Sequence, residues 1–93
     1  MPKQWDRWDI MRAVYAKGSN LTAIANSCEI DSSSCLHALD RPLLAGEIAI
    51  ASFIEVDPSI LWPARWRTPL TNARSIALEE WRASQILKLK RSA

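Results

Sequence analysis

Apolar residues recur along this chain at helical spacing, in short segments separated by turn-forming residues. The first segment covers residues 5–17 and stops at Gly18, a residue type that commonly ends helices. Asp6 and Asp9 lie near its start, where the helix dipole favours negative charge. Its apolar residues stand at i, i+1, i+4 and i+5, which predicts one inward face: Ile10, Met11, Val14 and Tyr15.

Residues 20–39 predict two short helices joined by a tight turn. Asn20 can cap the first helix and Asp31 the second, because their side-chain oxygens accept N–H groups of an opening turn. Glu29 stands where such turns usually have Gly, since the backbone there is left-handed. The inward residues are expected to be Leu21, Ile24, Ala25 and Cys28 in the first helix, and Cys35, Ala38 and Leu39 in the second. The pair predicts helix-turn-helix geometry, in which the second helix can enter a DNA major groove.

Two further helices are predicted after this pair. Pro42 ends the preceding helix, because proline disfavours helical geometry in the residue before it. The segment of residues 45–56 is apolar on several sides, which indicates a central helix. A short helix then begins at Pro58, since proline suits a first helical position, and Pro63 closes it. The chain has no alternating β-branched run, so we expect an all-α fold.

The last segment, residues 71–92, is rich in strong helix formers but has apolar residues on two sides. The two sides consist of Ile76, Ala83, Ile86 and Leu87, and of Leu78, Trp81 and Leu89. Two apolar sides need two surfaces to cover them. One surface would be the chain's own bundle and the other a second subunit, which predicts a homodimer through the C-terminal extension. The alternative is a partly frayed segment that becomes ordered only on binding.

Charge divides the chain near residue 66. Residues 1–66 have six basic and eight acidic side chains, a net charge of −2, whereas residues 67–93 have six basic and two acidic ones, a net charge of +4. We predict a helix-turn-helix domain over residues 1–66 and a C-terminal helical extension over residues 67–93, which would serve dimerisation or DNA contact. Phosphate neutralisation supplies most non-specific affinity for DNA. Either basic residues cluster on one face of the domain, or the extension contributes.

Several kinds of function are disfavoured. The chain has no run of about 18 apolar residues that would span a membrane, and acidic residues near the N-terminus disfavour an export signal. We therefore expect a cytoplasmic protein. Cys28 and Cys35 have no histidines at ligand spacing, which predicts reduced core thiols and no metal site. The single His37 has no nearby nucleophile and no phosphate-binding Gly loop is present, so we expect no enzyme activity, cofactor or small-molecule substrate.

Several strings within residues 5–66 match a known pattern. They are Trp5, Arg7 and Asp9 at the start of the first helix, then LTAIA, CLHAL and GEIAIASFIE, and above all DPSILWPARW at residues 57–66. Through them the chain resembles the Ner-like proteins, small λ-repressor-like DNA-binding regulators of Mu-type phages and their bacterial relatives. The resemblance implies a compact bundle of about five helices, to which this chain adds a C-terminal helix. It also implies a sequence-specific regulator that binds a double-stranded operator and represses phage-like early genes.

Three features depart from the Ner-like pattern. Glu29 stands where the family tends to have Gly, and the loop of residues 43–46 has no basic residue to lie near a phosphate. Residues 67–93 are not covered by the resemblance. The first two features bear on the tightness of DNA binding, and the third indicates an added element for assembly or DNA contact.

By the resemblance, the helix that begins after Asp31 is the reading helix. Its outward side supplies the predicted base contacts, Ser32, Ser33, Leu36 and His37. Serine hydroxyls can bond to any base edge, a leucine can contact a thymine methyl and a histidine can donate to guanine acceptors. The predicted phosphate contacts are Asn20, Thr22, Arg7 and Arg41, with Lys88, Lys90 and Arg91 of the extension as further contacts. A homodimer would bind two half-sites about 34 Å apart, or a multiple of this.

The alternative is a protein-interaction module that keeps the fold without binding DNA, as an antirepressor or a repressor's partner would. The net charge of residues 1–66 and the aspartates that flank the reading helix, Asp31 and Asp40, favour this alternative.

The tryptophans are mostly expected to pack inside the bundle, because large aromatic side chains contribute much of the core of a small domain. Trp5, Trp8, Trp62 and Trp66 are in this group, with Trp62 joining the short fifth helix to the first. Trp66 and Trp81 are also candidates for a subunit interface.

Overall fold

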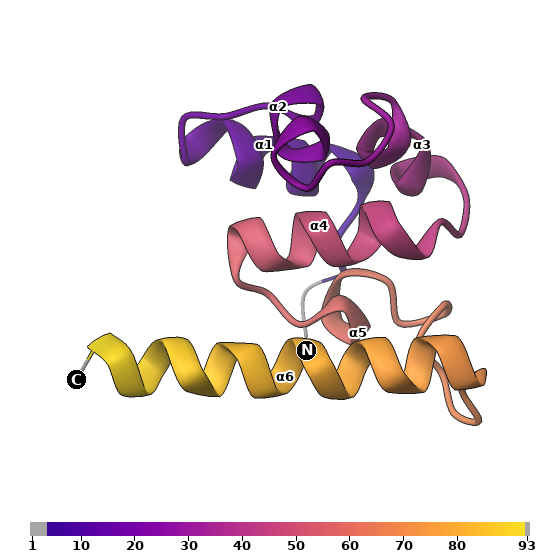
Figure 1. Cartoon of the computed structure of the whole chain (residues 1–93). Coiled ribbons are helices and arrows are strands. Elements are labelled where there is room, and N and C mark those ends of the chain that lie inside the picture. Colours follow the sequence, from indigo (N-terminus) through magenta and orange to yellow (C-terminus); the bar gives the residue numbers. More distant parts are fainter. Residues whose placement is uncertain (1–3, 93) are drawn as a thin grey trace.

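A computed structural model describes the backbone of residues 4–92 and the side chains of residues 4–88. The described residues form six helices and no strand (Figure 1). The helices are α1 Arg7–Ala16, α2 Leu21–Ser27, α3 Ser34–Asp40, α4 Leu44–Ile54, α5 Pro58–Leu61 and α6 Asn72–Ser92. This confirms the predicted all-α bundle of five helices with an additional C-terminal helix.

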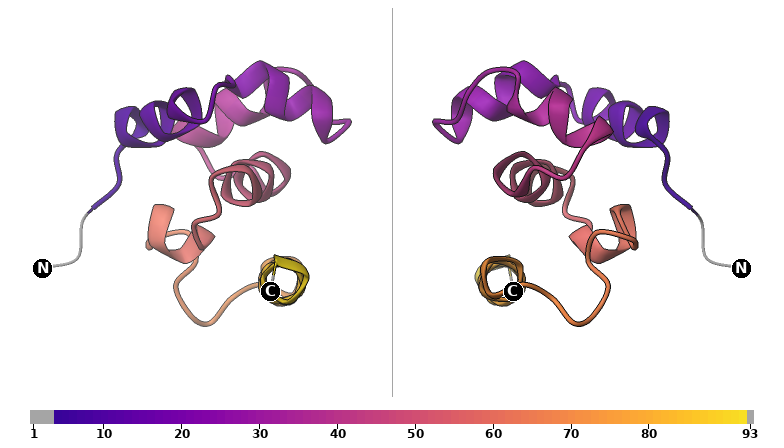
Figure 2. Two further views of the ribbon diagram at one scale, coloured as in Figure 1. Left: turned by 90° about the vertical axis from the view of Figure 1, so that its left-hand side faces the viewer. Right: turned by 90° about the vertical axis from the view of Figure 1, so that its right-hand side faces the viewer.

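The helices are arranged around α4. Figures 1 and 2 show α1, α2 and α3 on one side of α4, and α5 and α6 on the other. α4 packs against each of the five other helices, which explains why its sequence is apolar on several sides. As a result, α3 and α6 lie on opposite sides of the molecule.

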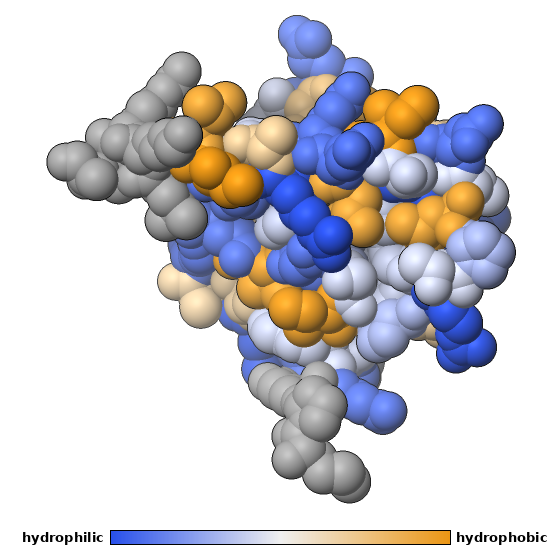
Figure 3. All heavy atoms as spheres, turned by 90° about the horizontal axis from the view of Figure 1, so that it is seen from below, coloured by the Kyte–Doolittle hydropathy of each residue, from blue (hydrophilic) through white to orange (hydrophobic). Residues whose placement is uncertain are grey.

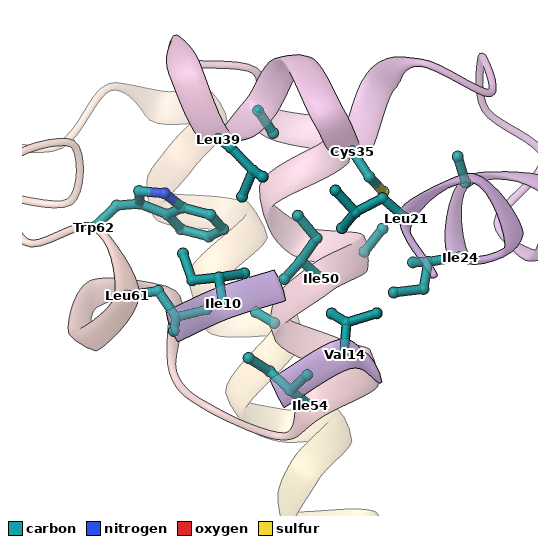
Figure 4. Packing of buried hydrophobic residues seen from close by; sticks show 14 of the residues in the cluster. Ile10, Val14, Leu21, Ile24, Cys35, Leu39, Ile50, Ile54, Leu61 and Trp62 are labelled. Atoms are coloured by element: carbon teal, nitrogen blue, oxygen red, sulfur yellow. The ribbon is translucent and has the colours of Figure 1, made fainter. Parts of the chain in front are cut away.

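The core is built around α4 from side chains of all the helices that surround it (Figure 4). Ile50 of α4 is fully buried and is surrounded in Figure 4 by Ile10, Val14, Leu21, Ile24, Cys35, Leu39, Ile54, Leu61 and Trp62. The contact between α3 and α4 is especially close at Gly46. A Cβ atom there would lie 2.5 Å from the Ser34 carbonyl oxygen and 2.8 Å from the Cβ of Ala38. Glycine is therefore required for α3 to pack at this distance.

In the segment from Asn20 to Ser34, the predictions for Asn20 and Glu29 are confirmed and the prediction for Asp31 is wrong. Asn20 caps α2, since its Oδ1 accepts the N–H of Ala23 at 2.8 Å, and Glu29 has the predicted left-handed backbone with φ +58°. Asp31 does not cap α3, which begins three residues later at Ser34. Its carboxylate accepts instead from the backbone N–H of Ser33 at 2.9 Å and from the Ser33 hydroxyl at 2.6 Å. These bonds stabilise a turn, because short side chains compete with helix for the same N–H groups.

Several predictions of inward residues were wrong. Cys28 is exposed, because it is the C-cap of α2 and lies where the chain leaves the helix. Trp8 is 57% exposed and Tyr15 is exposed as well, since both lie on the side of α1 that faces away from α4. Trp66 and Trp81 are buried within the chain, so neither is available for a subunit interface.

α6 is a continuous 21-residue helix with the predicted two apolar sides. Leu78 and Trp81 are buried on the side that packs against α4. Ile76, Ile86 and Leu87 remain exposed on the other side. Despite the length of α6, no helix in the described range is apolar enough to cross a membrane.

Candidate nucleic-acid interface

The predicted base-contacting residues occupy one exposed surface formed by α3 and the turn that precedes it. Leu36 and His37 are exposed side chains on α3, and Leu36 is a large apolar residue that the fold leaves in solvent. Ser32 is exposed and Ser33 half-buried, but both lie in the turn before the helix rather than on it. The surface faces away from α4 and is not covered by α6 (Figure 1).

The C-terminal end of α3 is held by Arg65, a residue that the sequence analysis did not assign to the site. Its guanidinium donates to the carbonyl oxygen of Ala38 and, at 3.4 Å, to that of Leu39. The same guanidinium lies 5.3 Å from the centre of the Trp62 ring. The last carbonyls of a helix carry partial negative charge and lack partners within the helix, so a cation stabilises them. Arg65 therefore helps to position α3 through hydrogen bonds at its C-terminal end.

Arg65 belongs to a buried polar network centred on Glu47 of α4. Glu47 is completely buried, yet its carboxylate accepts from the N–H of Leu43 at 2.7 Å and from the indole N–H of Trp66 at 2.9 Å. Arg74 of α6 donates to both carboxylate oxygens, at 2.7 and 3.0 Å. Arg65 completes the network at 3.5 Å. The network thus joins α3, α4 and α6, using the Trp and Arg residues of the DPSILWPARW string.

Glu47 remains ionised because its partners outweigh its burial. Burial raises the pKa of Glu47, but the hydrogen bonds from Arg74 and Leu43 and the charges of Arg74 and Arg65 lower it below its ordinary value. The signal in the sequence was Glu47, an acidic residue near the beginning of a mostly apolar helix, because such a charge needs a partner when the helix is buried. The sequence did not identify which residues the partners are.

The predicted phosphate contacts Asn20, Thr22 and Arg41 are all exposed. Asn20 and Thr22 lie at the beginning of α2, where Asn20 acts as the cap. Arg41 directly follows α3, and its guanidinium lies 3.4 Å from the Nδ1 atom of His37. Arg41 therefore adjoins the exposed side chains of α3.

Arg7 is already engaged in an ion pair. Its guanidinium donates to Asp40 at the end of α3 at 2.6 Å and lies 5.4 Å from the centre of the Trp8 ring. Its Nε atom is buried and has no hydrogen-bond partner among the described residues. Arg7 consequently links α1 to α3, and the pair neutralises one of the two aspartates that flank the reading helix.

Asp31, the other flanking aspartate, keeps its charge at the beginning of the surface. The hydroxyl of Ser33 and, after it, the backbone N–H of the same residue lower the pKa of Asp31 by hydrogen bonding to the carboxylate. Asp31 therefore places an ionised carboxylate at the beginning of the surface, whereas Asp40 at the other end of α3 is paired with Arg7.

The predicted tail contacts lie apart from this surface. Lys88 is on α6, where its ammonium is 3.9 Å from a carboxylate oxygen of Glu55. α6 and α3 lie on opposite sides of α4, so the structure does not bring Lys88 together with the reading helix (Figure 2). The side chains of Lys90 and Arg91 fall outside the described residues.

Comparison with known proteins supports a DNA-binding role. Residues 4–78 match the family of winged helix-turn-helix DNA-binding proteins. Sugar fermentation stimulation protein B of Escherichia coli K12 is 34% identical over 68 residues, which are 73% of this chain and 74% of that protein. A negative regulator of transcription from Escherichia phage Mu is 26% identical over 65 residues, 70% of this chain and 87% of that protein. No solved structure matches the chain significantly.

These matches confirm the resemblance to the Ner-like proteins. The family match continues past residue 66, through the first turns of α6, and ends at residue 78. The matched residues 4–78 form helices, turns and loops in this structure. They contain no strand that would correspond to the wing named in the family's description.

Proposed function

Because this chain belongs to the family of winged helix-turn-helix DNA-binding proteins and is a DNA-binding transcriptional regulator, we propose that it represses transcription by placing α3 in the major groove of a double-stranded operator. The observation that supports this proposal most directly is that Leu36 and His37 of α3 are exposed, on a helix that lies on the side of α4 opposite α6 (Figure 1). Leu36 on this side is an exposed apolar side chain, and α3 packs closely on α4 at Gly46 and accepts hydrogen bonds from Arg65 at its C-terminal end.

Base contacts are assigned to the surface formed by α3 and its preceding turn. Leu36 would contact a thymine methyl, His37 would donate to guanine acceptors, and Ser32 and Ser33 would bond to base edges or phosphates. None of these side chains makes the bidentate contacts that Arg, Asn or Gln provide. The sequence-dependent shape of the DNA would therefore supply much of the preference.

Phosphate contacts are assigned to both sides of the reading helix. Arg41 at the end of α3, and Asn20 and Thr22 at the beginning of α2, are exposed and can approach the backbone of the duplex. Arg7 would reach a phosphate only by leaving Asp40, so its contribution is expected to be smaller. Lys88, Lys90 and Arg91 would add affinity only if α6 also meets DNA.

The direction of regulation and the assembly state are also part of the proposal. Repression, of phage-like early genes, is supported by the phage Mu relative, a negative regulator of transcription. A cytoplasmic location follows from the same role, since the operators of bacteria and their phages lie there. The exposed apolar side of α6 supports self-association into a homodimer. No enzyme activity is assigned.

A gel shift with the promoter region that flanks the chain's own gene tests the function. A Leu36→Asp substitution would place a carboxylate in the groove and lower affinity at least about tenfold. Ser84→Asp is the matched control, because it adds the same charge at an exposed position of α6. Equal binding by both variants would contradict the role of α3.

The second candidate function is the protein-interaction module, which the apolar side of α6 also favours. In that case the duplex would not shift at either of two salt concentrations. A shift that weakens as salt increases supports DNA binding instead, because phosphate contacts release counterions.

A further inference from the structure

Arg74, in the first turn of α6, is turned towards the centre of the molecule. Seen from below in Figure 3, the face that α6 forms has hydrophilic side chains at its surface, but the side chain of Arg74 is only 15% exposed. Its guanidinium lies 4.7 Å from the centre of the Trp66 ring and donates to both carboxylate oxygens of Glu47. α6 and α3 lie on opposite sides of α4 (Figure 1). Arg74 can therefore affect the reading helix only through the residues that it contacts.

Arg74 completes the set of hydrogen bonds that the carboxylate of Glu47 can accept. An ionised carboxylate offers about four acceptor positions, two on each oxygen. Oε1 accepts from the indole N–H of Trp66 at 2.9 Å and from Arg74 at 2.7 Å. Oε2 accepts from the backbone N–H of Leu43 at 2.7 Å and from Arg74 at 3.0 Å. One position on each oxygen is thus filled by Arg74.

Arg65 is the other cation beside this carboxylate, and it makes its hydrogen bonds elsewhere. Its Nη1 atom is 3.5 Å from Oε2 of Glu47, longer than an ordinary hydrogen bond. It donates instead to the carbonyl oxygen of Ala38 and, at 3.4 Å, to that of Leu39. Burial raises the pKa of Glu47, and among the causes that lower it the hydrogen bond from Arg74 is the largest and the charge of Arg65 the smallest. Arg74 is therefore the principal partner of the carboxylate.

We propose that Arg74 is a positioning residue for DNA binding, because by filling the acceptor positions of Glu47 it leaves Arg65 to hold the C-terminal end of α3. The inference rests on the proposed function and concerns how the reading helix is held. Without Arg74, a buried carboxylate would have vacant acceptor positions, which is strongly unfavourable. A carboxylate carries a full charge and attracts a guanidinium more strongly than a carbonyl oxygen does. Arg65 would therefore turn from α3 to Glu47.

The loss of Arg65 from α3 would reach the predicted DNA contacts. The carbonyl oxygens of the last turn of α3 would lose a donor from outside the helix, and this turn could then shift against α4. Leu36 and His37 lie in the same short helix, and Arg41 directly follows it. Their alignment with the groove and with the phosphates depends on where α3 ends. α6 thus supports the reading helix without approaching the DNA.

A titration of DNA affinity tests the proposal, with a duplex from the promoter region that flanks the chain's own gene. Arg74→Met removes the guanidinium and keeps an apolar stem beside Trp66. At a temperature where circular dichroism shows the variant fully folded, we expect its affinity to be lower by about tenfold, the scale of one lost charged hydrogen bond. Arg82→Met is the matched control, because it removes the same charge from α6 and breaks an ion pair with Asp57, at 2.9 Å, outside the network of Glu47. It should bind DNA as the wild type does.

Two double variants distinguish positioning from a general effect on stability. Arg65→Met should lower affinity as Arg74→Met does, and the double variant should lose no more than Arg65→Met alone, because Arg74 acts through Arg65. Glu47→Gln combined with Arg74→Met should regain most of the affinity, since a neutral amide no longer draws Arg65 away from α3. Losses that multiply in the first double variant, or no recovery in the second, would overturn the proposal.

Amide NMR spectra of the protein without DNA give an independent measurement. The amide resonances of residues 39–41 should shift in Arg74→Met and stay in place in Arg82→Met. If Arg74→Met does not fold, Arg74→Lys replaces it, because an ammonium group keeps the buried charge paired but lacks the fork that reaches both oxygens. Its affinity should be lower by about threefold, since it fills fewer acceptor positions.

The outcomes separate this proposal from the proposed function. If the wild type binds the duplex and the folded Arg74 variants bind it equally well, the positioning role is overturned and the proposed function stands. If the wild type binds no duplex, the proposed function fails. Unshifted resonances at the end of α3 in the Arg74 variants would overturn the positioning role in either case.

Discussion

At the scale of single residues, Glu47 shows how a charge becomes part of a core. A buried carboxylate without partners is strongly unfavourable, and here Arg74, Trp66 and the N–H of Leu43 all donate to it. Removing one member of such a network leaves the others buried and unpaired. The stability of the fold should therefore respond to the protonation of this one side chain.

The pH dependence of stability can be derived from the direction of the Glu47 shift. Its folded-state pKa lies below the ordinary value of about 4.3, so its contribution is complete above that pH and is lost as the pH falls further. In urea unfolding at pH 7 and pH 3, the Glu47→Gln variant should lose less stability between the two pH values than the wild type. An identical loss in both would contradict the assignment, since the other carboxylates are the same in both proteins.

The two cysteines should differ in reactivity towards a thiol reagent. Burial raises the pKa of the Cys35 thiol to about 11 and also shields it from solvent, whereas Cys28 is exposed. We expect one thiol to react in the folded protein and both in denaturant, as measured by absorbance with a disulfide reagent. The Cys28→Ser variant should show no rapid reaction, and a rapid one would contradict the burial of Cys35.

At the scale of helices, the contact between α3 and α4 depends on the absence of a side chain at Gly46. Alanine normally stabilises a helix by about 1 kcal/mol relative to glycine. Here the added Cβ would collide with the Ser34 carbonyl and with Ala38, so α3 must move. The reading helix is thus positioned by a close backbone contact as well as by Arg65.

Gly46→Ala should therefore destabilise the protein by roughly 1–3 kcal/mol, against the usual helix preference, because overpacking a core forces the backbone to shift. Chemical denaturation measures the loss of stability. A gel shift should also show that the folded variant binds DNA more weakly than the wild type. Ala45→Ser, at the exposed neighbouring position, should change the unfolding free energy by no more than about 0.5 kcal/mol. A stabilised Gly46→Ala variant would show that α3 is not held at this distance.

At the scale of the whole molecule, the positions of the charged side chains matter more for DNA binding than the net charge does. The bundle has more acidic than basic residues, but Asp40 is paired with Arg7, and Glu47 is enclosed by Arg65 and Arg74. Two of the eight negative charges of residues 1–66 are thereby paired within the protein. Arg41 remains exposed beside α3 as the cation nearest in sequence to the reading helix.

Arg41→Ala should weaken binding to all DNA sequences alike and reduce the slope of log affinity against log salt by about one. This is the behaviour of a phosphate contact, which carries charge and no base preference. Titrations of operator and unrelated duplexes at several salt concentrations measure both quantities, with Arg12→Ala on α1 as the control. A change of preference at one base pair, with the slope unaltered, would instead make Arg41 a base contact.

Local features of the sequence were enough to predict most of the helices. Asn20, Gly18 and Pro58 act within about one turn of their own position, and helical periodicity depends on neighbours three or four residues away. The same locality explains the errors. Asp31 could cap a helix or stabilise a turn with equal chemistry. Cys28 lies at the end of α2 and Trp8 on the side of α1 that faces away from α4, so the burial of both depends on which elements cover them.

The helices, their order, the resemblance to Ner-like regulators and the two-sided character of α6 were therefore accessible from the amino-acid sequence. Other features required the folded structure. They are the partners of Glu47, the hydrogen bonds from Arg65 to the end of α3, the pairing of Arg7 with Asp40, and the positions of α3 and α6 on opposite sides of α4. The physical reason is separation along the chain. Trp66 and Arg74 are 19 and 27 residues from Glu47, and no local rule determines which distant side chains packing will bring together.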